Sequence, residues 1–153
     1  MSVMRAARER CDEGRDGGSA IIEFLVLATL MLVPVVYLVV TIGRLQAAAF
    51  ATQGAAREAA RAFVTATDEA SGRERADAAA MIAWADQGFR DPHLASVRIS
   101  CAPTCLAPGS RVAVRTSLQV VLPAVPRLVD RFLPARIQVD ARHQAPVERF
   151  AAR

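Results

Sequence analysis

Residues 24–43, FLVLATLMLVPVVYLVVTIG, run for twenty positions without a charged side chain. At about 1.5 Å per residue a helix of this length spans roughly 30 Å, which is the thickness of a bilayer's hydrocarbon core. Pro34 would break a helix in water, but membrane helices tolerate such a residue. A buried helix of a soluble protein can share this composition, but a run this long is unusual in so small a chain. The stretch therefore predicts a single membrane-spanning helix.

The surrounding charges predict the direction in which this helix crosses the membrane. Four Arg lie in the 18 residues before residue 19, whereas only Arg44 and Arg57 lie in the first fifteen residues after the run. Basic residues are enriched on the cytoplasmic side, so we expect a cytoplasmic N-terminus and a C-terminal domain outside the cell membrane. The chain is 53% hydrophobic, which excludes a fully disordered protein. Its net charge is +4, and the basic residues are scattered along the chain among acidic ones, which argues against a nucleic-acid partner.

The junction before the apolar run, RDGGSAIIEF at residues 15–24, has an unusual order of residue types. A charged leader ends at Gly17 and Gly18, small and apolar residues follow, and one carboxylate, Glu23, stands at the edge of the run. An acid at the centre of a membrane helix costs roughly 2.5 to 3.5 kcal/mol, and less near the interface. Taken alone, Glu23 can be interpreted as a hydrated residue at the level of the lipid headgroups, with no special function.

The whole junction resembles the processing site of type IV pilins and pseudopilins. The resemblance implies that a membrane peptidase cuts between Gly18 and Ser19, which would make Glu23 the fifth residue of the mature chain, followed by Phe24. It also implies that the Glu23 carboxylate meets the new amine of a neighbouring subunit and sets the register between packed helices. From about residue 15 to 150 the chain resembles, more narrowly, the TadE-like proteins of high-GC Gram-positive bacteria, which are associated with tight-adherence (Flp) pilus loci.

This resemblance implies a structural role, not an enzyme: a minor, pseudopilin-like component of a Tad-type pilus or related secretion apparatus. Its implied partners are the lipid bilayer, the prepilin peptidase, other pilins and the Tad inner-membrane platform, with no nucleic acid, small-molecule substrate or cofactor. The expected organisation is a cytosolic leader at 1–18, a transmembrane segment at 19–43, an extracytoplasmic helical region at 44–90 and a β-rich domain at 91–153.

The rest of the chain predicts an α+β fold: one long pilin-like helix, a second helix and a small antiparallel sheet. The first helix is expected from Ala20 to about Val64, followed by a loop at 65–73 and a helix at 74–89 that ends before Asp91 and Pro92. Period-two alternation predicts three strands, around 97–101, 112–120 and 136–142, and a short helix is expected near 128–132. The first helix is expected to present one apolar face outside the membrane, formed by Phe50, Ala51, Ala55, Ala59, Ala62 and Phe63. This face permits close approach of other helices, covers the sheet, or does both on different sides. The expected core residues of the second helix are Ala79, Ile82, Ala83 and Trp84.

The cysteines and histidines suggest little chemistry. Cys11 lies on the predicted cytosolic side and should be reduced, whereas Cys101 and Cys105 lie outside, where disulfides persist, and are expected to be bonded to each other. A free pair is the alternative, and a zinc site is improbable because no second Cys pair exists. His93 and His143 belong to no recognisable nucleophile motif and are interpreted as surface residues.

Two other functional classes stay open. Ordinary signal peptidase cutting after the small residues Ala47, Ala48 and Ala49 would release a secreted binding protein that starts at Phe50. An uncleaved anchor carrying an extracellular sensor domain would keep an N-terminus near Met1. The mature N-terminal residue distinguishes these alternatives from cleavage before Ser19.

Overall fold

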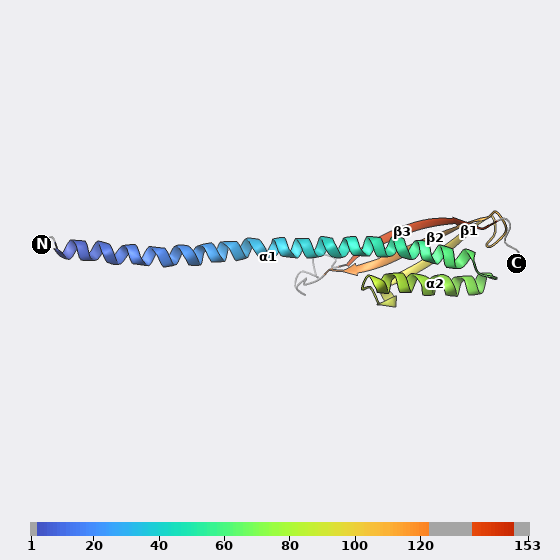
Figure 1. Ribbon diagram of the computed structural model, residues 1–153, viewed down its shortest axis with the longest axis horizontal. Helices are drawn as coiled ribbons and strands as arrows, with labels where there is room; N and C mark the ends of the chain where they lie inside the picture. Colours follow the sequence, from blue (N-terminus) through green and yellow to red (C-terminus); the bar gives the residue numbers. More distant parts are fainter. Residues whose placement is uncertain (1–2, 123–135, 149–153) are drawn as a thin grey trace. The chain divides into compact units, whose positions relative to one another are not determined.

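A computed structural model describes residues 3–122 and 136–148 of the chain (Figure 1). It confirms the α+β arrangement of a long N-terminal helix, a second helix and a three-stranded antiparallel sheet. The chain divides into two compact units, Met1–Val40 and Thr41–Arg153. The elements are α1 (Val3–Val64), α2 (Glu69–Asp86), the 3-10 turn η1 (Pro92–Leu94), β1 (Ala95–Ala102), β2 (Arg111–Val121) and β3 (Arg136–Pro146).

The first unit consists of the N-terminal part of α1. The helix begins at Val3, well before the expected start at Ala20, and it continues through Pro34 without a break. The side chains of residues 19–40 are all exposed, including those of the large apolar residues. Exposing so large a contiguous apolar patch to water is unfavourable, so this surface favours contact with lipid or with another protein.

The second unit begins with the remainder of α1, which presents a stripe of small residues to the core. Phe63 is fully buried at the end of this stripe, whereas Phe50 is 67% exposed, so the expectation that Phe50 shares one helix face with Phe63 was wrong. The two phenylalanines are thirteen residues apart, which at 100° per residue places them on nearly opposite sides of the helix. The buried residues of this part of α1 are Ala48, Ala51, Thr52, Ala55, Ala56, Ala59, Ala60 and Phe63.

Helix α2 begins five residues earlier than the sequence pattern predicts. The Asp68 carboxylate accepts a hydrogen bond from the backbone N–H of Ser71 at 2.9 Å and so caps the first turn. The residues expected to form a loop therefore belong partly to a helix, and the connection from α1 is short. The helix ends at Asp86, and Gly88 follows with a φ of +85°, a left-handed conformation that favours glycine.

The inward face of α2 lies close to α1. A Cβ atom built on Gly72 would lie 3.1 Å from Cδ2 of Phe63, so the missing side chain permits this close approach. Trp84 is 1% exposed, which confirms its expected place in the core. Ile82 is 63% exposed, so its assignment to the core was wrong, and Ala76 and Ala80 are fully buried instead.

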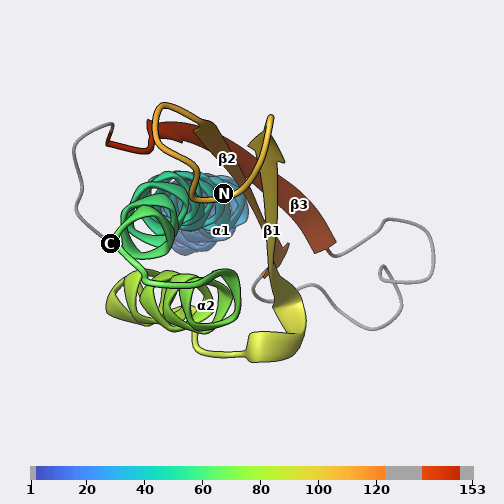
Figure 2. The same cartoon turned by 90° about the vertical axis from the view of Figure 1, so that its right-hand side faces the viewer.

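The sheet has the order β1-β2-β3, and both strand pairs are antiparallel. Its buried face packs on the helices, as Figure 2 shows along the axis of α1. The Thr116 hydroxyl on β2 donates a hydrogen bond to the Thr52 carbonyl of α1 at 2.9 Å, which satisfies a buried polar group where sheet and helix meet. All three expected strands are present; the short helix expected near 128–132 lies outside the described residues.

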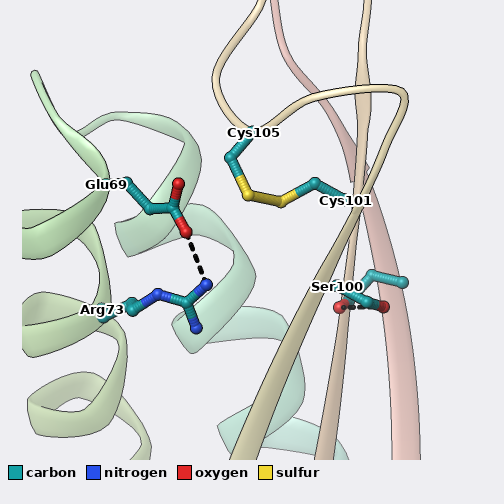
Figure 3. The surroundings of a disulfide bond; sticks show 6 residues. Glu69, Arg73, Ser100, Cys101 and Cys105 are labelled. Carbon is teal, nitrogen blue, oxygen red and sulfur yellow. Dashed lines mark hydrogen bonds and ion pairs between the residues drawn. A yellow bond between two sulfur atoms is a disulfide. The ribbon is translucent and has the colours of Figure 1, made fainter.

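The loop that joins β1 to β2 contains the disulfide expected between Cys101 and Cys105 (Figure 3). Cys101 lies in β1, opposite Val112 of β2, and Cys105 lies in the connecting loop. Leu106 and Val147, both nearly buried, join the core at this end of the second unit. A cross-link of this short loop stabilises the folded state by about 2 kcal/mol in the loop-closure model.

Candidate processing and assembly segment

The predicted processing site lies inside a helix. Helix α1 includes Gly17 and Gly18, and it continues through Ser19 and Glu23 into the apolar run. Each glycine in a helix interior costs up to about 1 kcal/mol relative to alanine. The two adjacent glycines are therefore the point of the N-terminal segment at which the helix opens most easily.

Glu23 and Phe24 lie next to each other on the exposed surface of α1. The Phe24 side chain is 70% exposed, and the Glu23 side chain is exposed as well. Among the residues that the structure describes, Glu23 has no hydrogen-bond or ion-pair partner. As far as the described residues are concerned, this carboxylate can accept a donor from another molecule.

One side of the apolar segment carries a shallow groove that sequence reasoning missed. Each of its residues has another groove residue three or four positions away, so they lie on a single face of the helix. The uniform hydrophobicity of the run hides this face, because no polar residues mark the other sides. The groove is lined by Ile22, Leu25, Val26, Thr29, Leu30, Val33 and Pro34.

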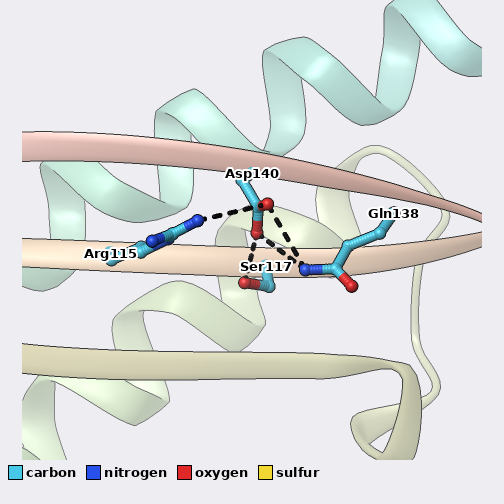
Figure 4. A network of polar contacts seen from close by, with 4 residues as sticks. All are labelled: Arg115, Ser117, Gln138 and Asp140. Carbon is cyan, nitrogen blue, oxygen red and sulfur yellow. Dashed lines mark hydrogen bonds and ion pairs between the residues drawn. The ribbon is translucent and has the colours of Figure 1, made fainter.

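Among the described residues of the second unit, the side chain with the most hydrogen bonds is that of Asp140 on the outer face of β3 (Figure 4). The Ser117 hydroxyl donates to its Oδ1 at 2.5 Å, and the Gln138 amide donates to Oδ1 at 3.1 Å and to Oδ2 at 3.3 Å. Arg115 forms an ion pair with Oδ2 at 3.5 Å. These hydrogen bonds, that of Ser117 first, hold the pKa of the Asp140 carboxyl below its usual 3.8.

The lowered pKa of Asp140 predicts how its contribution to stability depends on pH. A carboxyl with a lowered pKa in the folded state stabilises that state above pH 3.8, and this contribution disappears as pH falls through the folded pKa. Asp140→Asn should therefore lower the melting temperature at pH 7, and its difference from wild type should shrink toward zero below pH 3.8. Thermal unfolding across pH 2.5 to 7 checks this, with Asp77→Asn as the control, since Asp77 has no hydrogen bond or ion pair among the described residues. A pH-independent difference for Asp140→Asn would contradict the linkage.

The histidines differ in position from each other. His93 is exposed in η1, in agreement with its interpretation as a surface residue. His143 lies in β3, directly opposite Val114 on the core-facing side, and it is half-buried, which corrects its interpretation as a surface residue in part. In the described ranges, no group of three or more His, Cys, Asp or Glu side chains could hold a metal ion.

The described residues contain one helix segment, Ser19–Val64, that is long and apolar enough to cross a membrane, and the most apolar part of it is not buried. Residues 18–61 match the family model described as "TadE-like protein". No curated protein and no solved structure matches the chain. The match begins at Gly18, within the junction, and covers the apolar run and much of the remainder of α1, whereas α2 and the sheet lie beyond it. Residues 18–61 are therefore similar to TadE-like proteins, which is consistent with a component associated with a Tad pilus.

Proposed function

We propose that this protein is a membrane-anchored, pseudopilin-like minor component of a Tad-type pilus or related secretion apparatus, matured by cleavage between Gly18 and Ser19. The observation that carries the proposal is that Gly18, Ser19 and Glu23 lie at the start of the segment that matches the TadE-like model. Directly after it, α1 exposes a continuous apolar surface that no other described part of the chain covers. The N-terminus is cytoplasmic and the second unit lies outside the membrane, as the distribution of arginines favours.

In this proposal the apolar segment has two functions, anchoring and assembly. Before cleavage the exposed residues contact lipid. During assembly, the groove that runs from Ile22 to Pro34 receives the apolar helix of a neighbouring pilin-type subunit. Helix association in lipid depends on close packing, since lipid and apolar side chains are equally hydrophobic. A groove on one face therefore selects one orientation among many.

Glu23 adds axial register to this packing. Cleavage creates an ammonium group on Ser19, and a low-dielectric surrounding strengthens its attraction to the carboxylate of a neighbouring chain. Either charge alone would be costly there, so helices that pair the two charges are favoured over shifted ones. Glu23 has no partner within the described residues, which leaves it available for this contact.

The decisive experiment is sequencing of the mature N-terminus after expression with a prepilin peptidase. A chain that begins at Ser19 supports the proposal. A start at Phe50 would instead indicate a secreted protein, and a start near Met1 an uncleaved anchor. The fold disfavours a start at Phe50, because that cut would remove Ala48, which is fully buried, and Arg44, whose guanidinium lies 5.4 Å from the centre of the Phe89 ring.

Replacing Glu23 by Ala tests the assembly step separately from cleavage. We expect the mature N-terminus to stay at Ser19, while the amount of protein that copurifies with the assembled apparatus falls about tenfold or more, equivalent to a lost interaction of about 1.4 kcal/mol. Glu58→Ala is the matched control, because Glu58 is an exposed glutamate on the same helix outside the apolar run. Normal incorporation of the Glu23 variant would contradict the register argument.

A further inference from the structure

The three strands hold the whole excess of positive charge in the chain. They contain five arginines and one acid, Asp140, whereas the remaining residues contain fourteen arginines and fourteen acids. Along the sequence these arginines are widely spaced, and they appear scattered. The antiparallel register brings them onto a single face of the sheet. The five are Arg98, Arg111, Arg115, Arg136 and Arg142.

Three of these arginines form a row across the sheet. Arg98 of β1 lies directly opposite Arg115 of β2, and Arg115 lies directly opposite Arg142 of β3. All three are exposed, on the face opposite the buried valines of β2. Adjacent strands are about 4.8 Å apart, so three cationic side chains start within roughly 10 Å of one another.

This row is unfavourable for the fold by itself. Like charges directly opposite each other on neighbouring strands destabilise a sheet. The only acidic side chain on the strands, Asp140, reaches Arg115 at 3.5 Å and is already hydrogen-bonded by Ser117 and Gln138. Arg98 and Arg142 have no acidic partner among the described residues. The structure therefore has an unbalanced cationic row that an external anion would stabilise.

The surroundings of the row are suited to an oxyanion. Two hollows flank it, and both are lined by Arg98 and Arg115; Arg142 and the Asp140 carboxylate also line the second. The neutral donors beside the first hollow include the Ser96 hydroxyl and the Gln119 amide. The Ser100 hydroxyl in the second hollow already donates to the Ala113 carbonyl at 3.3 Å. A guanidinium binds phosphate oxygens in pairs, and hydroxyls and amides can donate to the remaining acceptor oxygens.

We propose that the outer face of the sheet binds a linear phosphate polymer through the row of Arg98, Arg115 and Arg142. A line of cations at regular spacing complements a chain of repeated negative charges better than it complements a single small ion. The strands contain no Phe, Tyr or Trp, so this face has no platform on which nucleobases could stack. Recognition is therefore limited to the phosphate groups. The proposal does not depend on pilus assembly.

Binding of the full chain, in a neutral detergent, to fluorescently labelled linear polyphosphate tests this inference. The triple variant Arg98→Gln/Arg115→Gln/Arg142→Gln should bind at least tenfold more weakly. The slope of log affinity against log salt concentration should also become less steep by about two. Each lost phosphate contact reduces the magnitude of this slope by roughly 0.7 to 0.9. The matched control, Arg61→Gln/Arg75→Gln/Arg90→Gln, removes the same charge from exposed positions outside the sheet and should stay within threefold of wild type.

Further measurements separate the site from its alternatives. Relief of like-charge repulsion should leave the melting temperature of the first triple variant equal to or above that of wild type. If that variant does not fold, Arg98→Lys/Arg115→Lys/Arg142→Lys replaces it in the binding assay. This Lys variant should bind more weakly than wild type, because lysine lacks the bidentate fork of arginine. Equal losses in both Gln variants would overturn the proposal, since they would indicate nonspecific attraction. Three competitors would also overturn it. Polyglutamate bound as tightly as polyphosphate would indicate an acidic protein as the ligand, and orthophosphate bound as tightly would indicate a small ion. Single-stranded DNA bound more tightly would indicate a nucleic acid.

Discussion

Replacing Gly18 by Val should leave the leader attached, so that the protein retains its first 18 residues in cells that process the wild type. The expected effect is close to complete loss of cleavage, because a protease cleft must approach the backbone on both sides of the bond that it cuts. Valine adds a branched side chain beside that bond, where glycine has none. Intact-mass measurement of the purified protein distinguishes the two forms.

The structure adds a second reason for this effect. The bond between Gly18 and Ser19 lies within helix α1, and a helical peptide must unwind locally to enter a protease cleft. Glycine lowers the cost of unwinding by up to about 1 kcal/mol relative to a good helix former. Valine makes the helix harder to unwind than glycine does, and its side chain also crowds the protease cleft. Each of these two effects slows cleavage.

Gly17→Val is the matched control for this experiment. It places the same side chain one residue away and raises helix stability in the same way, but it leaves the residue before the cut unchanged. We expect it to be cleaved, if more slowly than wild type. Cleavage of the Gly18 variant at the normal position would contradict the proposed site, and equal loss in both variants would indicate that helix unwinding limits the reaction.

The sequence was most informative where one repeating pattern continued over many residues. The uncharged run at 24–43 and the alternation around Val112 to Val120 predicted the apolar helix and the central strand. It was least informative on the helices outside the run. Alanine is so frequent there that several faces appear equally apolar. The pattern placed Phe50 on the face of Phe63 and Ile82 in the core, although Phe50 and Ile82 are both exposed.

Other features depend on contacts that a sequence pattern does not contain. The start of α2 depends on the Asp68 carboxylate capping the N–H of Ser71, whereas the string of polar residues around it resembles a loop. The arginine row depends on strand register, because Arg98 and Arg142 are 44 positions apart in the chain. In the candidate processing segment the residues of the junction were identified from sequence, but the groove beside Glu23 was not.

Replacing Phe63 by Ala should cause the largest loss of stability in the second unit. Truncating a fully buried phenylalanine costs about 3 to 5 kcal/mol, a large share of the 5 to 15 kcal/mol typical of a whole domain. The melting temperature should fall by about 10 to 20 °C. Trp84, the only tryptophan of the chain and itself buried, supplies the fluorescence signal for unfolding of the full chain in detergent.

Phe50→Ala is a matched control for this variant. It makes the same change in the same helix, and the exposed position predicts a change within about 0.5 kcal/mol. A loss of stability at Phe50 similar to that at Phe63 would show that the second unit packs differently from the described fold. A third variant, Phe63→Leu, should lie between Phe63→Ala and wild type because it refills part of the cavity.

The contact between Phe63 and Gly72 allows a sharper test, because the effect of one substitution should depend on the other. In wild type, Gly72→Ala brings its new Cβ to 3.1 and 3.3 Å from the Phe63 ring, and we expect crowding to offset the helix propensity of alanine. In the Phe63→Ala background both of these contacts are absent, and only the Ala66 Cβ at 3.2 Å remains. There the same substitution should stabilise, by up to about 1 kcal/mol. Additive effects in the double-mutant cycle would contradict direct packing of α2 on this ring, since side chains in contact couple and distant ones do not.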